Sequence, residues 1–261
     1  MATDDWYPPA LKNFAPNDGG SHLGPVTVGV LHTTESTRFA PRAGDYFGNS
    51  SYPHFTVMVV SGRFYVWQHI GIRRAARALK NRSGGVQTNR EGVIQIEVVG
   101  TATKPFTTSN AMVEGLRDLM RWIESETDIP QKSSVNFTAY PKSYGERAAQ
   151  RLDNDEWTRY AGWLGHQHVP ENDHGDPGAI DIDLLLDGSG IKPPPLITEL
   201  EDNMKIVHAP GKATCAVLAT GRFVALNGEE VTALRAIGTP IEGITVAEWD
   251  TLDRFSKRLG L

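Results

Sequence analysis

The pattern of hydrophobic and polar positions predicts several β-strands in the first hundred residues. Valines at every second position fill residues 26–32, a segment that ends in His32. Residues 54–60 and 64–67 are rich in β-branched and aromatic side chains and flank a Ser-Gly-Arg turn, which predicts a hairpin. Residues 93–100 alternate again, so that apolar side chains share one face of a strand and polar side chains the other.

Helical spacing appears in two later segments. Hydrophobic residues recur on one face over about 109–126, with charged residues opposite, which predicts an amphipathic helix. A second helix is expected at about 144–164, where Trp157 and Leu164 would face inward. Strands mixed with helices in this way, together with a hairpin, indicate an α/β or α+β fold in which a sheet is flanked by helices. We predict the α/β class, with a mixed central sheet.

A run of Gly, Ser and Pro marks a boundary near residue 188. Gly and Ser followed by three prolines are typical of a flexible joint that leads into an extended spacer. We therefore expect one domain at 1–187, a linker at 188–202 and a small α+β module at 203–261. The module is expected to contain short strands at 204–208, 216–219 and 223–226 and helices at 229–237 and 246–259.

Composition narrows the possible partners. The formal net charge is −5, of which residues 203–261 carry +1 and the rest −6, so neither part has the basic pattern of a nucleic-acid-binding protein. No apolar run reaches the roughly 18–20 residues needed to cross a bilayer, so membrane insertion is not expected. The start of the chain lacks the basic and apolar regions of a signal peptide, and the single Cys215 excludes an intrachain disulfide. The oligomeric state is not determined by these features.

Side chains that could bind a metal are most concentrated at residues 165–178, which hold three histidines and three carboxylates among prolines and glycines. The segment has no hydrophobic period and is predicted to be a loop. Histidine and carboxylate side chains suit a divalent metal, and a catalytic zinc takes three protein ligands and keeps one position open. His166 and Asp176 could supply two ligands, and His32, at the end of a core strand, is the best-placed third. A solvated acidic loop is the alternative.

Three motifs follow one another in a recognisable order. They are the strand that ends in His32, Ile-Gln-Ile-Glu at 94–97, and a Gly-His to Asp-Pro-Gly loop at 165–178. Together they resemble the type-2 N-acetylmuramoyl-L-alanine amidases, which share their fold with peptidoglycan recognition proteins and amidase-type phage lysozymes. The step of ten positions from His166 to Asp176 also matches that family. The resemblance covers about residues 25–186.

The resemblance implies a set of site residues. One Zn²⁺ ion per chain would be bound by His32, His166 and Asp176, and Glu97 would handle the proton of the attacking water. His174 stands where many family members have a lysine that faces the scissile carbonyl. A histidine departs from that pattern, and it would carry a positive charge only conditionally near neutral pH.

Other residues compete for these roles. His168 could chelate the metal from a His-x-His arrangement, and Glu35 is the alternative base. His54 and Arg77 are candidate substrate-binding residues, with core packing and a solvated surface as the respective alternatives. Where the family tends to have Trp-His-Ala, this chain reads Arg-Ala-Ala-Arg-Ala at 74–78, so one wall of the substrate cleft must differ.

These features predict a zinc hydrolase that cuts the amide bond between N-acetylmuramic acid and L-alanine in bacterial peptidoglycan. Because no signal peptide is present and an extra module suits an intact polymer, we expect a phage endolysin. Such an enzyme would stay in the host cytoplasm until the membrane opens and then act on the cell wall. The slight positive charge of the module would suit anionic wall polymers. A cytoplasmic amidase that recycles wall fragments, a non-catalytic peptidoglycan-binding protein and an unrelated zinc amide hydrolase are the alternatives.

Overall fold

The computed structural model describes residues 5–37, 51–60 and 62–186, and in the C-terminal part residues 205–208, 210–212, 215–217, 223–225, 241–243, 246 and 249–250. The chain divides into two compact units, of which the larger comprises most of residues 1–191 and the smaller comprises 192–261. The predicted linker at 188–202 and the predicted helix at 229–237 lie outside the described residues. The proposed domain boundaries therefore stay predictions.

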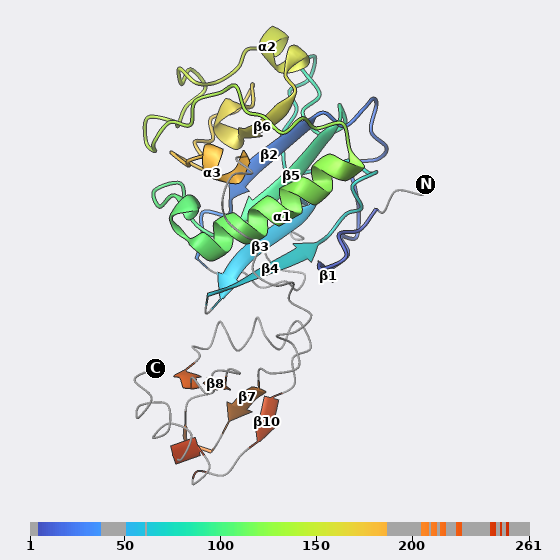
Figure 1. Cartoon of the computed structure of the whole chain (residues 1–261). Helices are drawn as coiled ribbons and strands as arrows, with labels where there is room; N and C mark the ends of the chain where they lie inside the picture. Colours follow the sequence, from blue (N-terminus) through green and yellow to red (C-terminus); the bar gives the residue numbers. More distant parts are fainter. Residues whose placement is uncertain are drawn as a thin grey trace. The chain divides into compact units, whose positions relative to one another are not determined.

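A six-stranded mixed sheet forms the frame of the larger unit (Figure 1). The strand order is β1-β4-β3-β5-β2-β6, in which β3 and β4 are antiparallel and the other neighbours are parallel. The predicted α/β class, the hairpin and both central strands are confirmed. The strands are β1 (Leu11–Lys12), β2 (Val28–Thr33), β3 (Phe55–Val60), β4 (Arg63–Gln68), β5 (Val93–Val98) and β6 (Gly162–Gly165).

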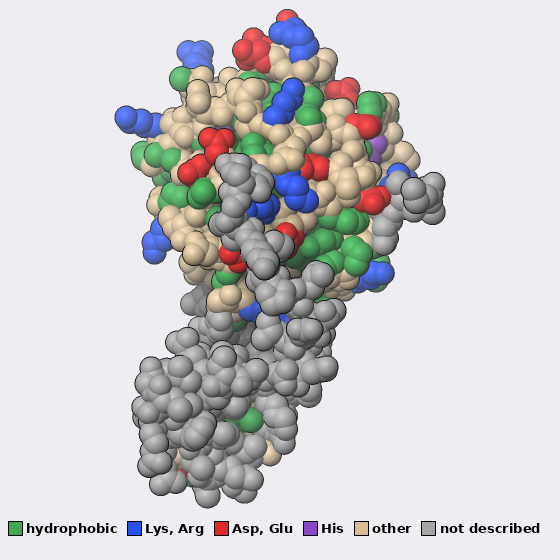
Figure 2. Space-filling view, in the orientation of Figure 1, with side chains coloured by type: hydrophobic (Ala, Val, Ile, Leu, Met, Phe, Trp, Pro, Cys, Tyr) green, Lys and Arg blue, Asp and Glu red, His purple; other side chains and the backbone are tan. Residues whose placement is uncertain are grey.

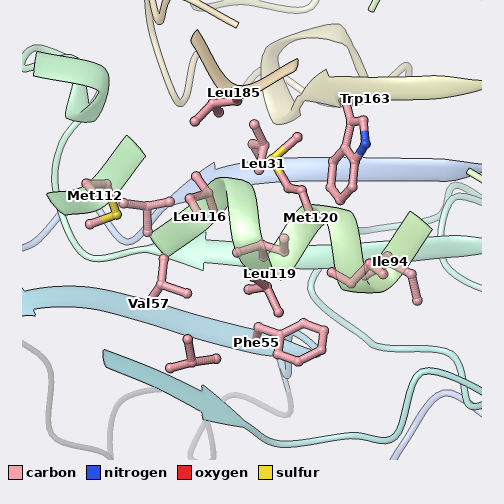
Figure 3. Packing of buried hydrophobic residues seen from close by; sticks show 14 of the residues in the cluster. Leu31, Phe55, Val57, Ile94, Met112, Leu116, Leu119, Met120, Trp163 and Leu185 are labelled. Atoms are coloured by element: carbon pink, nitrogen blue, oxygen red, sulfur yellow. The ribbon is translucent and has the colours of Figure 1, made fainter. Parts of the chain in front are cut away.

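Helix α1 (Asn110–Glu126) covers one face of this sheet, as predicted (Figure 1). The Ser109 side chain caps it by accepting a hydrogen bond from the backbone N–H of Met112. Figure 3 shows the helix side chains packed against Leu31 and Ile94 of the sheet. Burial of side chains of this size contributes about 1.5–3 kcal/mol each. The shorter helices are η2 (Phe106–Thr108), α2 (Asn154–Arg159), η3 (His166–His168) and α3 (Asp183–Leu186).

The opposite face of the sheet carries the polar side chains of the central strands. Successive residues of a strand point to opposite faces. Leu31 and Ile96 belong to the cluster around α1, so His32 and Glu97 point to the other side. His32 and Glu97 are also partners in the β2–β5 register. Both lie near the C-terminal ends of parallel strands, which is the edge where α/β sheets place their sites.

The second predicted helix is wrong over most of its length. Only α2 is helical there, and it begins with a capping box in which Asp153 and Glu156 each accept a hydrogen bond from the other's backbone N–H. Residues 162–165 instead form β6, which pairs with β2. Gly162 has a φ of 130°, and a Cβ there would lie 2.4 Å from the Lys132 carbonyl oxygen. This glycine therefore allows the chain to enter the sheet rather than continue a helix.

Trp163 of β6 packs over Gly29 of β2, its partner in the strand register. A Cβ at Gly29 would lie 2.3 Å from the indole ring, which is also held by a 2.7 Å hydrogen bond from Nε1 to Glu124. Gly29→Ala should therefore lower the free energy of unfolding by about 1–3 kcal/mol in urea titrations. Gly100→Ala is the control, because a Cβ at Gly100 would meet nothing within 4 Å. An equal loss in both variants would contradict this account.

The smaller unit contains a four-stranded sheet in the order β10-β7-β8-β9. Three of its strands match the predicted ones, namely β7 (Lys205–His208), β8 (Cys215–Val217) and β9 (Phe223–Ala225). No prediction covered β10 (Ile241–Gly243), which pairs in parallel with β7. Of the helix predicted at 246–259, the structure describes Val246, Trp249 and Asp250, and all three are helical.

The described surface of the larger unit mixes both signs of charge. Figure 2 shows acidic and basic side chains interspersed over one face, without a broad area of one sign among the residues that are coloured there. In the parts of the chain that the structure describes, no helix has the length and apolar character of a membrane span.

Candidate metal centre

Two histidines and one aspartate meet at the C-terminal ends of β2 and β6. His32 lies at the end of β2, His166 follows directly after β6, and Asp176 comes from the loop beyond η3. These side chains are buried, with 1%, 6% and 4% of their residues' surface exposed. One candidate ligand atom from each lies within 4.8 Å of the others. The structure thus brings together the three residues that the sequence predicts as metal ligands.

The distances between these atoms suit a tetrahedral zinc ion. The Nδ1 atoms of His32 and His166 lie 3.1 Å apart. Asp176 places Oδ2 3.7 Å from Nδ1 of His32 and Oδ1 3.2 Å from Nδ1 of His166. Zinc bonds of about 2.0–2.2 Å at tetrahedral angles separate ligand atoms by about 3.3–3.5 Å. The three side chains therefore fit a zinc ion with little rearrangement.

The protonation states of His32 and Asp176 also suit a metal. Burial, with a contribution from His166, lowers the pKa of His32 to about 3, so its imidazole is neutral. Burial by itself would raise the pKa of Asp176, but attraction and hydrogen bonding from His166, with a hydrogen bond from His174, hold it below its ordinary value. A neutral imidazole and an ionised carboxylate are the forms that bind a metal.

Glu97 lies beside the three candidate ligands. Its Oε1 is 4.0 Å from Nδ1 of His32, and its side chain is 13% exposed. Its Oε2 is buried and has no hydrogen-bond partner among the described residues. Burial and repulsion from Asp176 and Glu35 raise the pKa of Glu97 well above its ordinary value. A carboxyl group whose pKa is raised in this way is a candidate general acid or base beside the three candidate ligands.

His174 forms the outer side of the site. Its ring stacks on that of His166, with centroids 4.3 Å apart and an interplanar angle of 17°. Its Nδ1 lies 3.6 Å from Oδ1 of Asp176, and half of the His174 side chain is exposed. The interaction with Asp176 raises the pKa of His174. His174 therefore faces both the buried ligands and the solvent.

The two alternative residues have other partners. Nδ1 of His168 accepts a hydrogen bond from the backbone N–H of Gly165, and its Nε2 lies 3.0 Å from the Asn136 carbonyl oxygen. Oε1 of Glu35 accepts a hydrogen bond from the backbone N–H of Ala102 at 2.8 Å. The contacts of His168 favour a structural role, and those of Glu35 are to Thr33 and Ala102 rather than to the candidate ligands.

His54 lies in the protein interior, against the expectation that it lines the substrate cleft. It is fully buried. Its Nδ1 accepts a hydrogen bond from the backbone N–H of Gln95, and its Nε2 donates one to the Arg74 carbonyl oxygen. Because both ring nitrogens are used within the protein, the structure favours the packing alternative for His54.

A cavity of about 640 Å³ reaches the candidate metal centre at His166 and His174. Arg77, one of the two candidate substrate-binding residues, lines it, and Lys80 and Arg90 add two further cations to the lining. The cavity is therefore suited to a ligand that carries negative charge. Its other polar lining residues are Ser51, Asn81, Gln87, Asn89, Asn172 and Asp18, whose carboxylate is bound by Arg74.

The sequence did not predict the residues that hold the loop carrying His166 and Asp176. The backbone N–H of Gln167 donates to the Asp176 carbonyl oxygen at 2.8 Å, and its side chain donates to that of Gly178 at 2.9 Å. Arg151 and Asn172 bind other carbonyl groups of the same loop. Every residue has a carbonyl group, so no sequence pattern marks these contacts.

Three buried histidines that are not candidate metal ligands predict a loss of stability in acid. Burial lowers the pKa of His54 to about 3 and those of His69 and His168 to about 4. The unfolded chain, with histidine pKa values near 6.5, therefore binds more protons as the pH falls, and stability present above pH 6.5 is lost toward pH 3 to 4.

Each of these histidines should lower the free energy of unfolding by about 2 kcal/mol between pH 7.5 and pH 5. Urea unfolding with a chelator present measures this loss without a contribution from metal release. His54→Gln should lose about 2 kcal/mol less than the wild type over the same interval. An identical pH dependence in the two proteins would show that His54 is not neutral in the folded state.

The comparisons with known proteins find matches only at low similarity. No family model and no curated protein matches the chain. A solved structure of a selenomethionine derivative of AmpD matches with 15% identity and a TM-score of 0.42, over 68% of this chain and 93% of that chain. A mutant of PlyL matches with 17% identity and a TM-score of 0.34, over 47% of this chain and 77% of that chain. At these values we infer the function from the residues of the site itself.

Proposed function

We propose that the larger unit is a zinc-dependent N-acetylmuramoyl-L-alanine amidase. The observation that carries this proposal is the buried group of His32, His166 and Asp176, whose ligand atoms have the spacing of a zinc site. Beside it, Glu97 has a raised pKa and an unpartnered buried oxygen. The substrate follows from the resemblance of these motifs to the type-2 amidases.

The proposed reaction is hydrolysis of the bond between the lactyl carbonyl of N-acetylmuramic acid and the nitrogen of L-alanine. Bound zinc would supply a Lewis acid that polarises the carbonyl and makes water acidic enough to react near pH 7. Glu97 would accept a proton from the attacking water and pass it to the leaving nitrogen as the C–N bond breaks. His174 would donate a hydrogen bond to the carbonyl oxygen as negative charge develops there. The products are a lactyl carboxylate and a peptide with a free amine.

The cationic wall of the cavity would bind the peptide stem, which carries carboxylates. Arg77 is exposed and lines this cavity together with Lys80, which stands three positions later in the sequence. In assays of the full-length enzyme, Arg77→Met should raise KM more than it lowers kcat for stems with free carboxylates. An unchanged KM would assign Arg77 to a solvated surface.

The biological setting is proposed as that of a phage endolysin, with the host cytoplasm before lysis and the cell wall afterwards as its two locations. The smaller unit would bind the wall through anionic polymers. A chain without residues 197–261 should then co-sediment less with purified walls than the full chain. Unchanged co-sedimentation would leave wall binding to the larger unit alone.

Mass spectrometry of purified peptidoglycan after digestion tests the reaction itself, with the wild type compared with His166→Ala. Stem peptides that begin with a free L-alanine amine should appear with the wild type alone. If other fragments appeared, the chain could still be a metal hydrolase, but its substrate would be a different one. Wall binding without any cleavage in the presence of zinc would make the chain a recognition protein.

A further inference from the structure

Arg151 makes an unusual set of contacts next to the metal centre. Its guanidinium donates to the carbonyl oxygens of Val169 and His174, both at 2.7 Å, and to that of Gly145 at 3.2 Å. It also donates to the side-chain oxygen of Asn172 at 3.0 Å. Burial lowers the pKa of Arg151, but an arginine stays charged. All four acceptors are neutral, and all four are bound by the N–H groups of one planar guanidinium.

The acceptors of Arg151 enclose the backbone of His174. The His174 carbonyl is bound by Arg151, and its N–H donates to Oδ1 of Asn172 at 2.8 Å. The Asn172 side chain is itself held by the Val169 carbonyl at 2.6 Å. The backbone carbonyl and N–H of His174 are therefore bound by Arg151 and Asn172, and these two side chains are hydrogen-bonded to each other.

The position of the His174 backbone determines where its ring can lie. That ring stacks on His166 and approaches Asp176, so it covers two of the three candidate ligands from the side of the cavity. A shift of the backbone would move the ring away from both. Arg151 also attracts the carboxylate of Asp176 electrostatically. Its hydrogen bonds, however, go to Gly145, Val169, Asn172 and His174 and to none of the three candidate ligands, so its effect on the position of the ring passes through this loop.

We propose that Arg151 is a positioning residue that holds the loop at 169–174, and through it His174, against the metal ligands. A lysine cannot replace it, because a single ammonium cannot reach four acceptors in a plane. Residues that support metal ligands from outside typically change metal affinity or activity by about 10- to 100-fold when replaced. The kinetic part of this proposal rests on the proposed amidase function, whereas the structural part does not.

The test compares Arg151→Met and Arg151→Lys with Arg147→Met, an exposed arginine on the same segment. Hydrogen exchange of peptides that cover 169–176 should become faster in both Arg151 variants, and zinc affinity should fall by about 10- to 100-fold. Exchange of α1 and of the central strands should stay unchanged. Arg147→Met should match the wild type in every measurement.

Chemical rescue separates positioning from a general structural role. Millimolar guanidinium added to Arg151→Ala should restore part of the zinc affinity and of the exchange protection, whereas sodium chloride at the same ionic strength should not. Asn172→Ala provides a second variant, which should speed the exchange of the His174 amide while Arg151 is intact. Faster exchange throughout the larger unit, without rescue, would overturn the proposal.

These measurements also separate this proposal from the proposed function. If the chain were not an amidase, the exchange and zinc-affinity effects would persist without any peptidoglycan cleavage. If the chain is an amidase and Arg151 positions His174, kcat should fall in Arg151→Met and recover with guanidinium. An amidase whose kcat and zinc affinity are unaffected by Arg151→Met would overturn the proposal and leave the function intact.

Discussion

Glu97→Gln is expected to lower the rate of amide hydrolysis by about 10²- to 10⁴-fold, because a glutamine amide cannot accept a proton from the attacking water. Zinc affinity should change by less than about tenfold, since Glu97 is not one of the three candidate ligands and lies 4.0 Å from Nδ1 of His32. The two measurements are kcat for release of stem peptides and the zinc Kd from competition with a chelator. A decrease in kcat without a decrease in zinc affinity is the result expected for a residue that transfers protons.

Glu35→Gln is the matched control for this prediction. Glu35 lies close enough to contribute to the raised pKa of Glu97. It is exposed, however, and one of its carboxylate oxygens accepts hydrogen bonds from Thr33 and Ala102. We therefore expect Glu35→Gln to keep most of the activity. If the larger loss of kcat came from Glu35→Gln, the general base would be Glu35 and not Glu97.

The strands that carry the site could be predicted because their signal is local. Alternation along β2 and β5 separates the residues that face α1 from His32 and Glu97, and each pattern is complete within six residues. The helix α1 has an equally local signal in its apolar stripe and its Ser109 cap. Where the side-chain pattern alone separates the two faces of an element, sequence and structure agree.

The segment at 144–164 could not be predicted in the same way. Trp157 and Leu164 have helical spacing, and both are buried, but they are buried in different elements. What separates them is Gly162, whose backbone conformation and close approach to Lys132 depend on the rest of the fold. A pattern of buried positions does not distinguish a helix from a turn followed by a strand when a glycine lies between them.

Hydrogen bonds between side chains and backbone groups also could not be predicted from the sequence. His54 stands at the start of the predicted hairpin, and in the folded chain it is buried with both ring nitrogens bonded to backbone groups of Gln95 and Arg74. Arg151 is likewise tied to carbonyl oxygens that no residue type identifies. The resemblance to a known family located the side chains that would meet a metal, but only the fold shows which residues support them.

Zinc is expected to raise the free energy of unfolding of the wild-type chain by about 4 kcal/mol when free zinc exceeds its Kd about 1,000-fold. The reason is that only the folded chain brings His32, His166 and Asp176 within 4.8 Å of one another. Asp176→Asn should remove most of this gain, because a neutral amide replaces the ionised carboxylate. Urea unfolding of chelator-treated protein, with and without added zinc, measures the gain directly and requires no substrate.

Asp173→Asn is the control that makes the metal prediction specific to one carboxylate of the loop. Asp173 is three positions from Asp176, and its carboxylate accepts a 2.7 Å hydrogen bond from the Tyr144 hydroxyl instead of facing the two histidines. Its replacement removes the same charge from the same loop, so any non-specific attraction of zinc to the loop would fall equally in both variants. We expect Asp173→Asn to keep the full stabilisation by zinc. Equal stabilisation of Asp176→Asn and the wild type would remove Asp176 from the ligand set, and with it the open three-ligand site on which the proposed hydrolysis depends.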